Sequence, residues 1–168
     1  MRFSGLSGMS KFMGRAAAVA GAAAITATLA AAPAQAATTV GTLQNQQTGL
    51  CLDGHTTFDA KVKTVPCEAG NPHQQWKFTN TGDTQTIVNV ATGQCLMFSK
   101  FPDEADFAWV LAIGCDANTP GARKWVQQGD TWRNSEFQNF CLDSSDLGNV
   151  YAQLCGDRKF QNWRQNAL

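Results

Sequence analysis

The sequence predicts an all-β fold assembled from three copies of one unit. The first cysteines of the copies, Cys51, Cys95 and Cys141, lie 44 and 46 residues apart. A period of roughly 20 to 50 residues indicates that each unit completes its apolar face against its neighbours. Between the cysteines, short runs rich in Val, Ile, Thr, Phe and Trp alternate with turn pairs such as Thr-Gly. No apolar spacing of three and four residues persists for ten residues, so these runs are predicted to be strands.

Each copy contains a turn, a Cys-Leu pair, a second cysteine and a tryptophan. In order, these are Gly49-Leu50-Cys51-Leu52-Asp53 with Cys67 and Gln74-Gln75-Trp76, then Gly93-Gln94-Cys95-Leu96-Met97 with Cys115 and Arg123-Lys124-Trp125, then Asn139-Phe140-Cys141-Leu142-Asp143 with Cys155 and Gln161-Asn162-Trp163. This skeleton resembles the ricin-type (ricin B-like) lectin domain, the β-trefoil of carbohydrate-binding module family 13. The resemblance implies a six-stranded barrel capped by three hairpins, and a lectin function.

The chain begins with the pattern of an export signal. Arg2, Lys11 and Arg15 precede an alanine-rich apolar run at 16–32, and Ala34-Gln35-Ala36 follows Pro33. A basic start, an apolar centre and a small-residue cleavage site are typical of a secretory signal peptide. A membrane anchor is the alternative, but the run is short and only mildly hydrophobic for a span of about 20 residues. We therefore predict a signal peptide at 1–36, a lectin domain at 37–168, and a secreted, extracellular protein.

Charge and length narrow the partners of the mature chain. The predicted leader carries three of the 13 basic residues and none of the 13 acids, so 10 basic residues remain against 13 acids, a net charge of −3. Nucleic-acid binding requires a basic footprint, so we predict no nucleic-acid partner. No basic amphipathic stretch indicates membrane insertion after signal removal. The 132 residues left after removing 36 from 168 form one domain, and we expect a monomer without a cofactor.

Six cysteines behind an export signal predict three disulfides, and counting alone allows 15 pairings. Each repeat unit holds two cysteines, separated by 16, 20 and 14 residues, so the symmetric solution pairs them within units. The predicted bridges are Cys51–Cys67, Cys95–Cys115 and Cys141–Cys155. Zinc is the competing interpretation, but no Cys-x-x-Cys pair occurs and both histidines belong to the first unit, so we predict no metal site.

Alignment on the second cysteine predicts which strand residues face the core. Five positions before it stand Val62, Val110 and Val150, the same β-branched residue in every copy. With alternating side chains, positions three and one before the cysteine share the inner face, and positions four and two face outward. The predicted outward residues are Lys63, Val65, Leu111, Ile113, Tyr151 and Gln153. The repeated tryptophans could stack on sugars, but their recurrence in every copy favours a core role.

The resemblance also implies roles for individual residues. In the family, the aspartate of Cys-x-Asp accepts hydrogen bonds from sugar hydroxyls, and the glutamine of Gln-x-Trp steadies it. An aromatic residue two positions before the second cysteine stacks on the sugar, and an asparagine before the glutamine adds a contact. In the third unit the aspartate, glutamine and aromatic positions hold Asp143, Gln161 and Gln153, the asparagine position holds Phe160, and Tyr151 lies nearby on the same outward face. We expect this unit to be the principal carbohydrate site.

The other two units depart further from the family pattern. The first keeps Asp53 and Gln74, with His73 at the asparagine position and Val65 at the aromatic position, and is predicted to be the second site. In the second, Met97, Ala122, Arg123 and Ile113 replace all four, which predicts an inactive unit. The alternative for both aspartates is that they cap the turn after a strand, as aspartate often does.

No motif of nucleophilic, metal-dependent or phosphate-binding catalysis occurs in the sequence. We therefore predict a non-catalytic protein that binds an extracellular polysaccharide or glycoconjugate, and not an enzyme. The alternative is a β-trefoil inhibitor or protein-binding module that acts through its surface loops.

Overall fold

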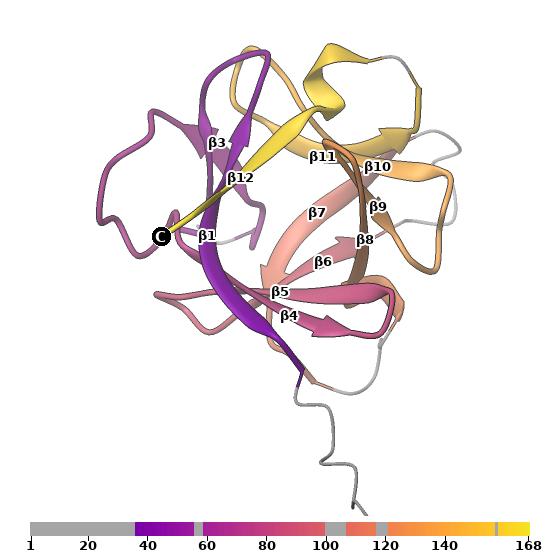
Figure 1. Cartoon of the computed structure of the whole chain (residues 1–168). Coiled ribbons are helices and arrows are strands. Elements are labelled where there is room, and N and C mark those ends of the chain that lie inside the picture. Colours follow the sequence, from indigo (N-terminus) through magenta and orange to yellow (C-terminus); the bar gives the residue numbers. More distant parts are fainter. Residues whose placement is uncertain (1–35, 56–58, 100–106, 117–120, 157) are drawn as a thin grey trace, which may run out of the picture. The chain divides into compact units, whose positions relative to one another are not determined.

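The computed structural model describes residues 36–55, 59–99, 107–116, 121–156 and 158–168, so the predicted leader, apart from Ala36, lies outside the described residues. The described residues form twelve β-strands and two short 3-10 helices (Figure 1). The first unit contributes β1 (Thr38–Asn45), β2 (Cys51–Asp53), β3 (Lys63–Val65) and β4 (Trp76–Thr81). The second contributes β5 (Thr84–Asn89), β6 (Cys95–Ser99), β7 (Phe107–Ile113), η1 (Gly121–Arg123) and β8 (Lys124–Gln128). The third contributes β9 (Thr131–Asn134), β10 (Phe140–Ser144), β11 (Val150–Leu154), η2 (Lys159–Gln161) and β12 (Trp163–Ala167). The prediction of an all-β, β-trefoil fold is confirmed.

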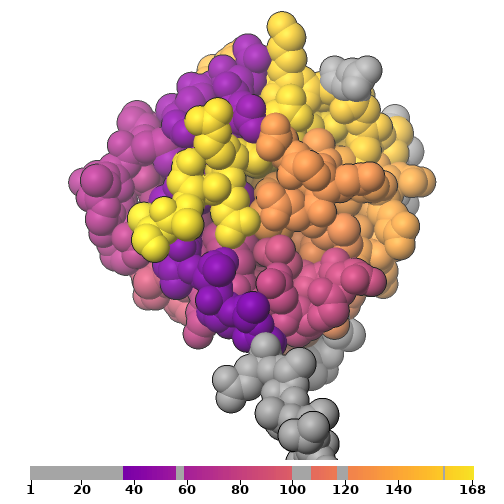
Figure 2. Space-filling view, viewed as in Figure 1, coloured from indigo at the N-terminus to yellow at the C-terminus, as the bar shows by residue number. Residues whose placement is uncertain are grey.

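Six strands, the first and last of each unit, form the barrel. Antiparallel pairing runs in the order β12–β1–β4–β5–β8–β9. The first and last strands of the domain lie side by side (Figure 2), with Gly41 opposite Ala167 and Asn45 opposite Trp163. Between β12 and β9, where the barrel closes, the backbone N–H of Trp163 donates to the carbonyl of Asp130, the residue before β9, at 2.7 Å. Pairing around a barrel leaves few free strand edges, which protects the sheet from aggregation.

The hairpins β2–β3, β6–β7 and β10–β11 form the cap, and three valines meet where they converge. Val62, Val110 and Val150 are 1%, 0% and 2% exposed, and the Val62 N–H points to the Val110 carbonyl at 3.4 Å. The predicted inner position is therefore confirmed. The expectation that the residue just before the second cysteine also faces inward is wrong. Those residues are exposed because the chain leaves the cap there to enter the disulfide loop: Pro66, Gly114 and Leu154.

The three repeated tryptophans lie in the core, as predicted. Trp76, Trp125 and Trp163 are 0% exposed. Each indole N–H donates to the carbonyl of the leucine in its own Cys-Leu pair, at 3.0, 2.9 and 3.0 Å respectively. A buried indole contributes a large apolar area, and this bond satisfies its polar atom. The bond also ties the end of each unit to its first cap strand.

A buried asparagine repeats with the same symmetry and was not predicted. Asn45, Asn89 and Asn134, the last residues of β1, β5 and β9, are at most 1% exposed. Each side-chain oxygen accepts backbone N–H groups two and three residues later. Each amide nitrogen donates to the carbonyl three residues before a core tryptophan: Phe160, His73 and Ala122. The asparagine thus fixes the turn that leads into each Cys-Leu strand.

Each unit closes on its own disulfide, as predicted. The bridges join Cys51 to Cys67, Cys95 to Cys115 and Cys141 to Cys155, with Cα–Cα distances of 5.0, 5.2 and 5.0 Å. The bridge fixes the loop between the cap hairpin and the tryptophan strand, and this loop carries the polar residues described next.

Candidate functional site

The polar centre of the third unit is a hydrogen-bonded pair, Asp143 and Gln161. The Gln161 side-chain amide donates to Oδ2 of Asp143 at 2.9 Å, and the Ser144 backbone N–H donates to Oδ1 at 2.7 Å. Gln161 also clamps the disulfide loop, because it donates to the Leu154 carbonyl at 3.1 Å and accepts from the Gly156 N–H at 3.1 Å. The glutamine of the Gln-x-Trp motif therefore positions the aspartate of the Cys-x-Asp motif, which lies 18 residues earlier.

This pair lies beneath the surface. Asp143 is 2% exposed and Gln161 is 0% exposed. Tyr151, directly opposite Asp143 on the neighbouring strand, is half-buried, and its hydroxyl donates to the Ser144 carbonyl at 3.0 Å. Gln153, also half-buried, accepts a hydrogen bond from exposed Arg158. The four residues predicted for this site lie close together, with Tyr151 and Gln153 on the solvent side of the carboxylate.

Burial governs the electrostatics of this site. Desolvation raises the pKa of Asp143 above its ordinary value of 3.8, against the lowering effects of the bonds from Gln161 and Ser144 and of the charge on Arg158. Desolvation is also the main cause of a raised pKa at the Tyr151 hydroxyl, and the negative charge of Asp143 raises that pKa as well. A raised acid pKa means that water is missing around the charged form. An incoming hydroxyl donor would replace part of that missing solvation.

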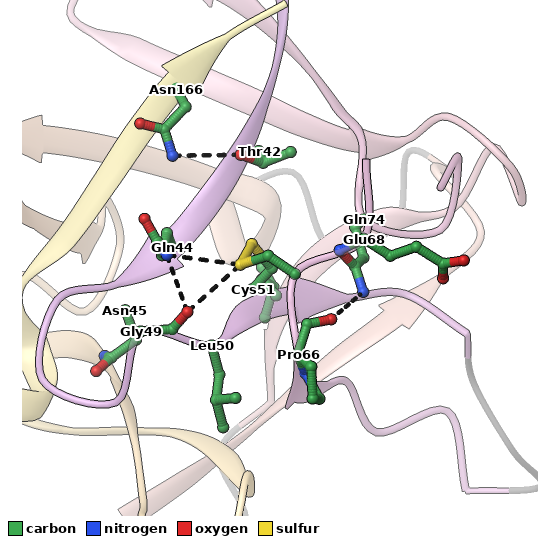
Figure 3. Close-up of a disulfide and its surroundings, with 12 residues drawn as sticks. Thr42, Gln44, Asn45, Gly49, Leu50, Cys51, Pro66, Glu68, Gln74 and Asn166 are labelled. Carbon is green, nitrogen blue, oxygen red and sulfur yellow. Dashed lines mark hydrogen bonds between the residues drawn. A yellow bond between two sulfur atoms is a disulfide. The ribbon is translucent and has the colours of Figure 1, made fainter. Parts of the chain in front are cut away.

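The first unit keeps the loop clamp without the carboxylate contact. Gln74 donates to the Pro66 carbonyl at 3.0 Å (Figure 3) and accepts from the Glu68 N–H at 2.8 Å, the same two bonds that Gln161 makes in the third unit. Asp53 accepts from the His55 N–H at 2.7 Å, so it caps its turn. The pairing of Gln74 with Asp53 that the resemblance implies is not formed here.

The histidine predicted for the first unit lies in this loop. The His73 ring contacts the ring of His55 edge to face, with centroids 4.7 Å apart. Its backbone carbonyl accepts bonds from the Gly54 N–H at 2.9 Å and from the Asn89 amide at 2.7 Å. Asp53 is buried, with 8% of the residue exposed, against 2% for Asp143. Of the residues predicted for the first unit, His73 is therefore the most exposed, and it is half-buried beside exposed His55.

The second unit has neither a carboxylate nor an amide side chain at the polar positions of the family pattern. Met97, Ala122 and Arg123, which occupy the aspartate, asparagine and glutamine positions, are each 8% exposed. A thioether accepts hydrogen bonds only weakly, so Met97 cannot reproduce the contacts that a carboxylate makes with sugar hydroxyls. Ile113, at the aromatic position, is half-buried on the outer face.

An aromatic cluster missed from the sequence lies beside Tyr151. Phe107 and Trp109 of β7 face β11, where they pair with Gln153 and Tyr151. The Phe107 ring centroid lies 4.8 Å from that of Trp109 and 5.2 Å from that of Tyr151. Their signal was present in the sequence. The outward alternation through Ile113 and Leu111 continues two and four residues earlier to Trp109 and Phe107.

These rings form one wall of a pocket of about 370 Å³ where the three cap hairpins meet. Its other residues come from the first and third units, and the lining is Asp59, Lys61, Val62, Lys63, Phe107, Trp109, Asn149, Val150 and Tyr151. The ammonium of Lys61 lies 3.6 Å above the Trp109 ring and 3.5 Å from a carboxylate oxygen of Asp59. Small-molecule sites are concavities of about 300 to 1,000 Å³ with aromatic walls and a few polar groups, and this pocket fits that description.

Two further structural findings concern metal binding and membrane-spanning helices. No group of three or more His, Cys, Asp or Glu side chains that could hold a metal occurs among the described residues. Within the same part of the chain, no helix is long and apolar enough to cross a bilayer.

A β-trefoil with one disulfide per unit, a tryptophan bound to each Cys-Leu carbonyl and a glutamine-supported aspartate defines a ricin B-like architecture. The family model of the ricin-type β-trefoil lectin domain matches residues 14–119 and 39–163. The chain belongs to this family.

Solved structures with the same fold include two lectins and one design. A designed threefold-symmetric protein, ThreeFoil, is 20% identical, with a TM-score of 0.64 over 77% of this chain and 99% of its own. The Rhizoctonia solani agglutinin is 18% identical, with a TM-score of 0.63 over 82% of this chain and all of its own (100%). The Macrolepiota procera ricin B-like lectin, solved with lactose, is 20% identical, with a TM-score of 0.61 over 81% and 99%. No curated protein matches the chain.

Proposed function

We propose that this chain is a secreted, non-catalytic carbohydrate-binding protein that recognises an extracellular polysaccharide or glycoconjugate, with its principal site in the third unit. The observation that carries the proposal is the Asp143–Gln161 pair beneath Tyr151 and Gln153. Family membership and the lactose complex of the Macrolepiota procera lectin support the ligand class. Charge-assisted hydrogen bonds are among the stronger polar contacts, so a carboxylate suits the recognition of sugar hydroxyls.

The arrangement of carboxylates argues for binding without hydrolysis. Glycoside hydrolysis requires two carboxyl groups about 5 to 9.5 Å apart on either side of one bond. Among the described residues that line the pocket beside Tyr151, Asp59 is the one carboxylate, and it is ion-paired with Lys61. Asp53 and Asp143 belong to different hairpins, and each is bonded to its own turn.

The test is retention on insoluble polysaccharides, using the parent and three variants. Asp143→Asn should weaken binding at least about tenfold, because a hydrogen bond to a charged group contributes around 1.5 to 3 kcal/mol. Asp53→Asn should weaken it less, and the double variant should abolish retention on polymers if both units act together. Met97→Leu, at the equivalent position of the second unit, is the matched control and should bind as the parent does.

Thermal unfolding of each variant separates lost binding from lost folding. A double aspartate variant that stays folded and still binds a polysaccharide as the parent does would exclude this site. If the parent is retained on no polysaccharide, the loop-mediated protein-binding or inhibitor function takes its place, and a protease-inhibition screen tests it. Intact mass of the secreted protein tests the export prediction, since cleavage after Ala36 leaves a chain that begins at Ala37.

A further inference from the structure

The second unit has lost its own polar site, but its cap hairpin reaches into the third. Its cysteines are separated by 20 residues, against 16 and 14 in the other units. Strand β7 extends over Phe107–Ile113, whereas β3 covers only Lys63–Val65. The first three residues of β7 pair with β11 of the third unit (Figure 1). The added length therefore lies against the unit that retains the Asp143–Gln161 pair.

This extension places aromatic rings where the third unit lacks one. Gln153 occupies the position at which the family stacks an aromatic residue on the sugar, and Phe107 is its direct partner across the strands. Trp109 is the partner of Tyr151, and both are half-buried. Directly opposed residues of an antiparallel pair share one face of the sheet, so all three rings face outward together.

These rings are not needed to fill the core. The alternate residues of β7, Ala108, Val110 and Ala112, point inward and are 0% exposed. The outer face instead presents partly exposed rings beside polar groups from the first and third units, namely Lys61, whose ammonium lies 3.6 Å above one face of the Trp109 ring, Lys63 and Asn149. Aromatic walls with a few polar groups are typical of sites that bind a small organic ligand.

We propose that the second unit supplies the stacking surface of the third unit's site, so that one compound site across β7 and β11 binds an oligosaccharide of at least two pyranose units. The Phe107 ring contacts both Trp109 and Tyr151, with centroids 4.8 and 5.2 Å away, so the aromatic cluster spans two strands and presents more than one ring to a ligand. The apolar C–H faces of the sugars pack against the rings, and their hydroxyls reach Asn149, Lys63 and the Asp143 side. This inference rests on the proposed carbohydrate-binding function.

Trp109 provides a direct optical test. The chain has five tryptophans, all within the described residues, and the other four are 0% exposed: Trp76, Trp125, Trp132 and Trp163. Acrylamide quenching of fluorescence therefore reports chiefly on Trp109. The probes are xylotetraose, cellotetraose, chitotetraose and β-1,4-galactotetraose, each compared with its monosaccharide. At least one tetrasaccharide should reduce the quenching constant severalfold, and its monosaccharide at equal concentration should do so much less.

Variants then separate stacking from folding. Trp109→Ala and Phe107→Ala should each weaken binding of that tetrasaccharide about tenfold, as expected for the loss of an aromatic contact. Trp109→Phe should recover most of the affinity. Leu111→Ala is the matched control, because Leu111 is also half-buried on the outward face of β7 but does not line the pocket. It should bind as the parent does.

The outcomes distinguish this inference from the proposed function. Asp143→Asn could weaken the retention of the protein on a polysaccharide while Trp109→Ala leaves it unchanged. That result would contradict the compound site and support a site within the third unit alone. Failure of every tetrasaccharide to protect Trp109 would also overturn it. If the parent protein is retained on no polysaccharide, both the compound site and the proposed carbohydrate-binding function are contradicted.

Discussion

The second and third units share a skeleton and differ at the aspartate and glutamine positions of the family pattern. Both have the disulfide, and both bond a core indole to the Cys-Leu carbonyl, at 2.9 Å from Trp125 and 3.0 Å from Trp163. The third unit retains a glutamine-supported carboxylate, whereas the second has Met97 at the aspartate position. The skeleton is constrained by the fold, since each unit must complete the same barrel and cap. The polar centre can be lost from one unit without loss of the fold.

The largest expected effect is the loss of stability when a core tryptophan is removed. Comparing this loss in the second and third units tests whether both skeletons contribute equally to stability. Trp125→Ala and Trp163→Ala should each lower the free energy of unfolding by about 3 to 5 kcal/mol, because each removes a fully buried ring. Chemical denaturation with disulfides intact measures both. Trp109→Ala, with its half-buried ring, should cost far less. A Trp125 variant as stable as the parent would show that the second unit is not constrained in this way.

The sequence could predict this skeleton because its residues are needed in every unit. The cysteines, the core tryptophans and Val62, Val110 and Val150 recur in one register, and each was assigned its correct place. The buried asparagines at the ends of β1, β5 and β9 recur equally but were missed. They sit six or seven residues before the first cysteine, outside the conspicuous motif. Their importance depends on backbone groups distant in sequence, which no local pattern reveals.

The disulfides come next in expected effect. Replacing Cys95 and Cys115 together by alanine should cost about 3 kcal/mol, because the bridge restricts the unfolded chain. The same change at Cys141 and Cys155 should cost nearly as much. The two loops, of 20 and 14 residues, differ by only about 0.3 kcal/mol in closure entropy. Denaturation of both double variants measures the comparison. A much smaller loss in the second unit would indicate that its longer β7 stabilises that hairpin without the bridge.

A smaller loss is expected from the buried asparagines. Asn89→Ala and Asn134→Ala should each cost about 1 to 3 kcal/mol, because each leaves backbone N–H and carbonyl groups unpaired. The two values should agree, although Asn89 leads into the degraded second unit and Asn134 into the third. Thermal unfolding of the two variants measures them, with Lys77→Ala, at an exposed position of the neighbouring strand β4, as the comparison. Clearly unequal losses of stability in the two variants would mean that the turn is less constrained in one unit than in the other.

The functional surface was predicted less completely than the skeleton. Asp143, Gln161, Tyr151 and Gln153 were placed together correctly, since the pairing of β10 with β11 and the Gln-x-Trp motif bring them into one unit. The contribution of β7 was missed because it depends on pairing between units, where Phe107 meets Gln153. A repeat-by-repeat comparison treats each unit as self-contained and cannot show such a contact. The burial of both aspartates was also missed.

The smallest expected effect concerns the charge that the third unit retains and the second has lost. Burial raises the pKa of Asp143 above 3.8, so between pH 3.8 and the folded-state pKa the folded protein binds more protons than the unfolded chain. Its contribution to the free energy of unfolding is therefore full below pH 3.8 and declines as the pH rises through the folded-state pKa. Asp143→Asn cannot titrate, so the melting temperature of the parent minus that of the variant should fall from pH 3 to pH 7, mostly between pH 3.8 and the folded-state pKa of Asp143. The difference in melting temperature between the parent and Met97→Leu should not change with pH. If the parent instead gains on the Asp143 variant as the pH rises, the bonds from Gln161 and Ser144 outweigh desolvation, and the carboxylate is stabilised in its charged form before any sugar arrives.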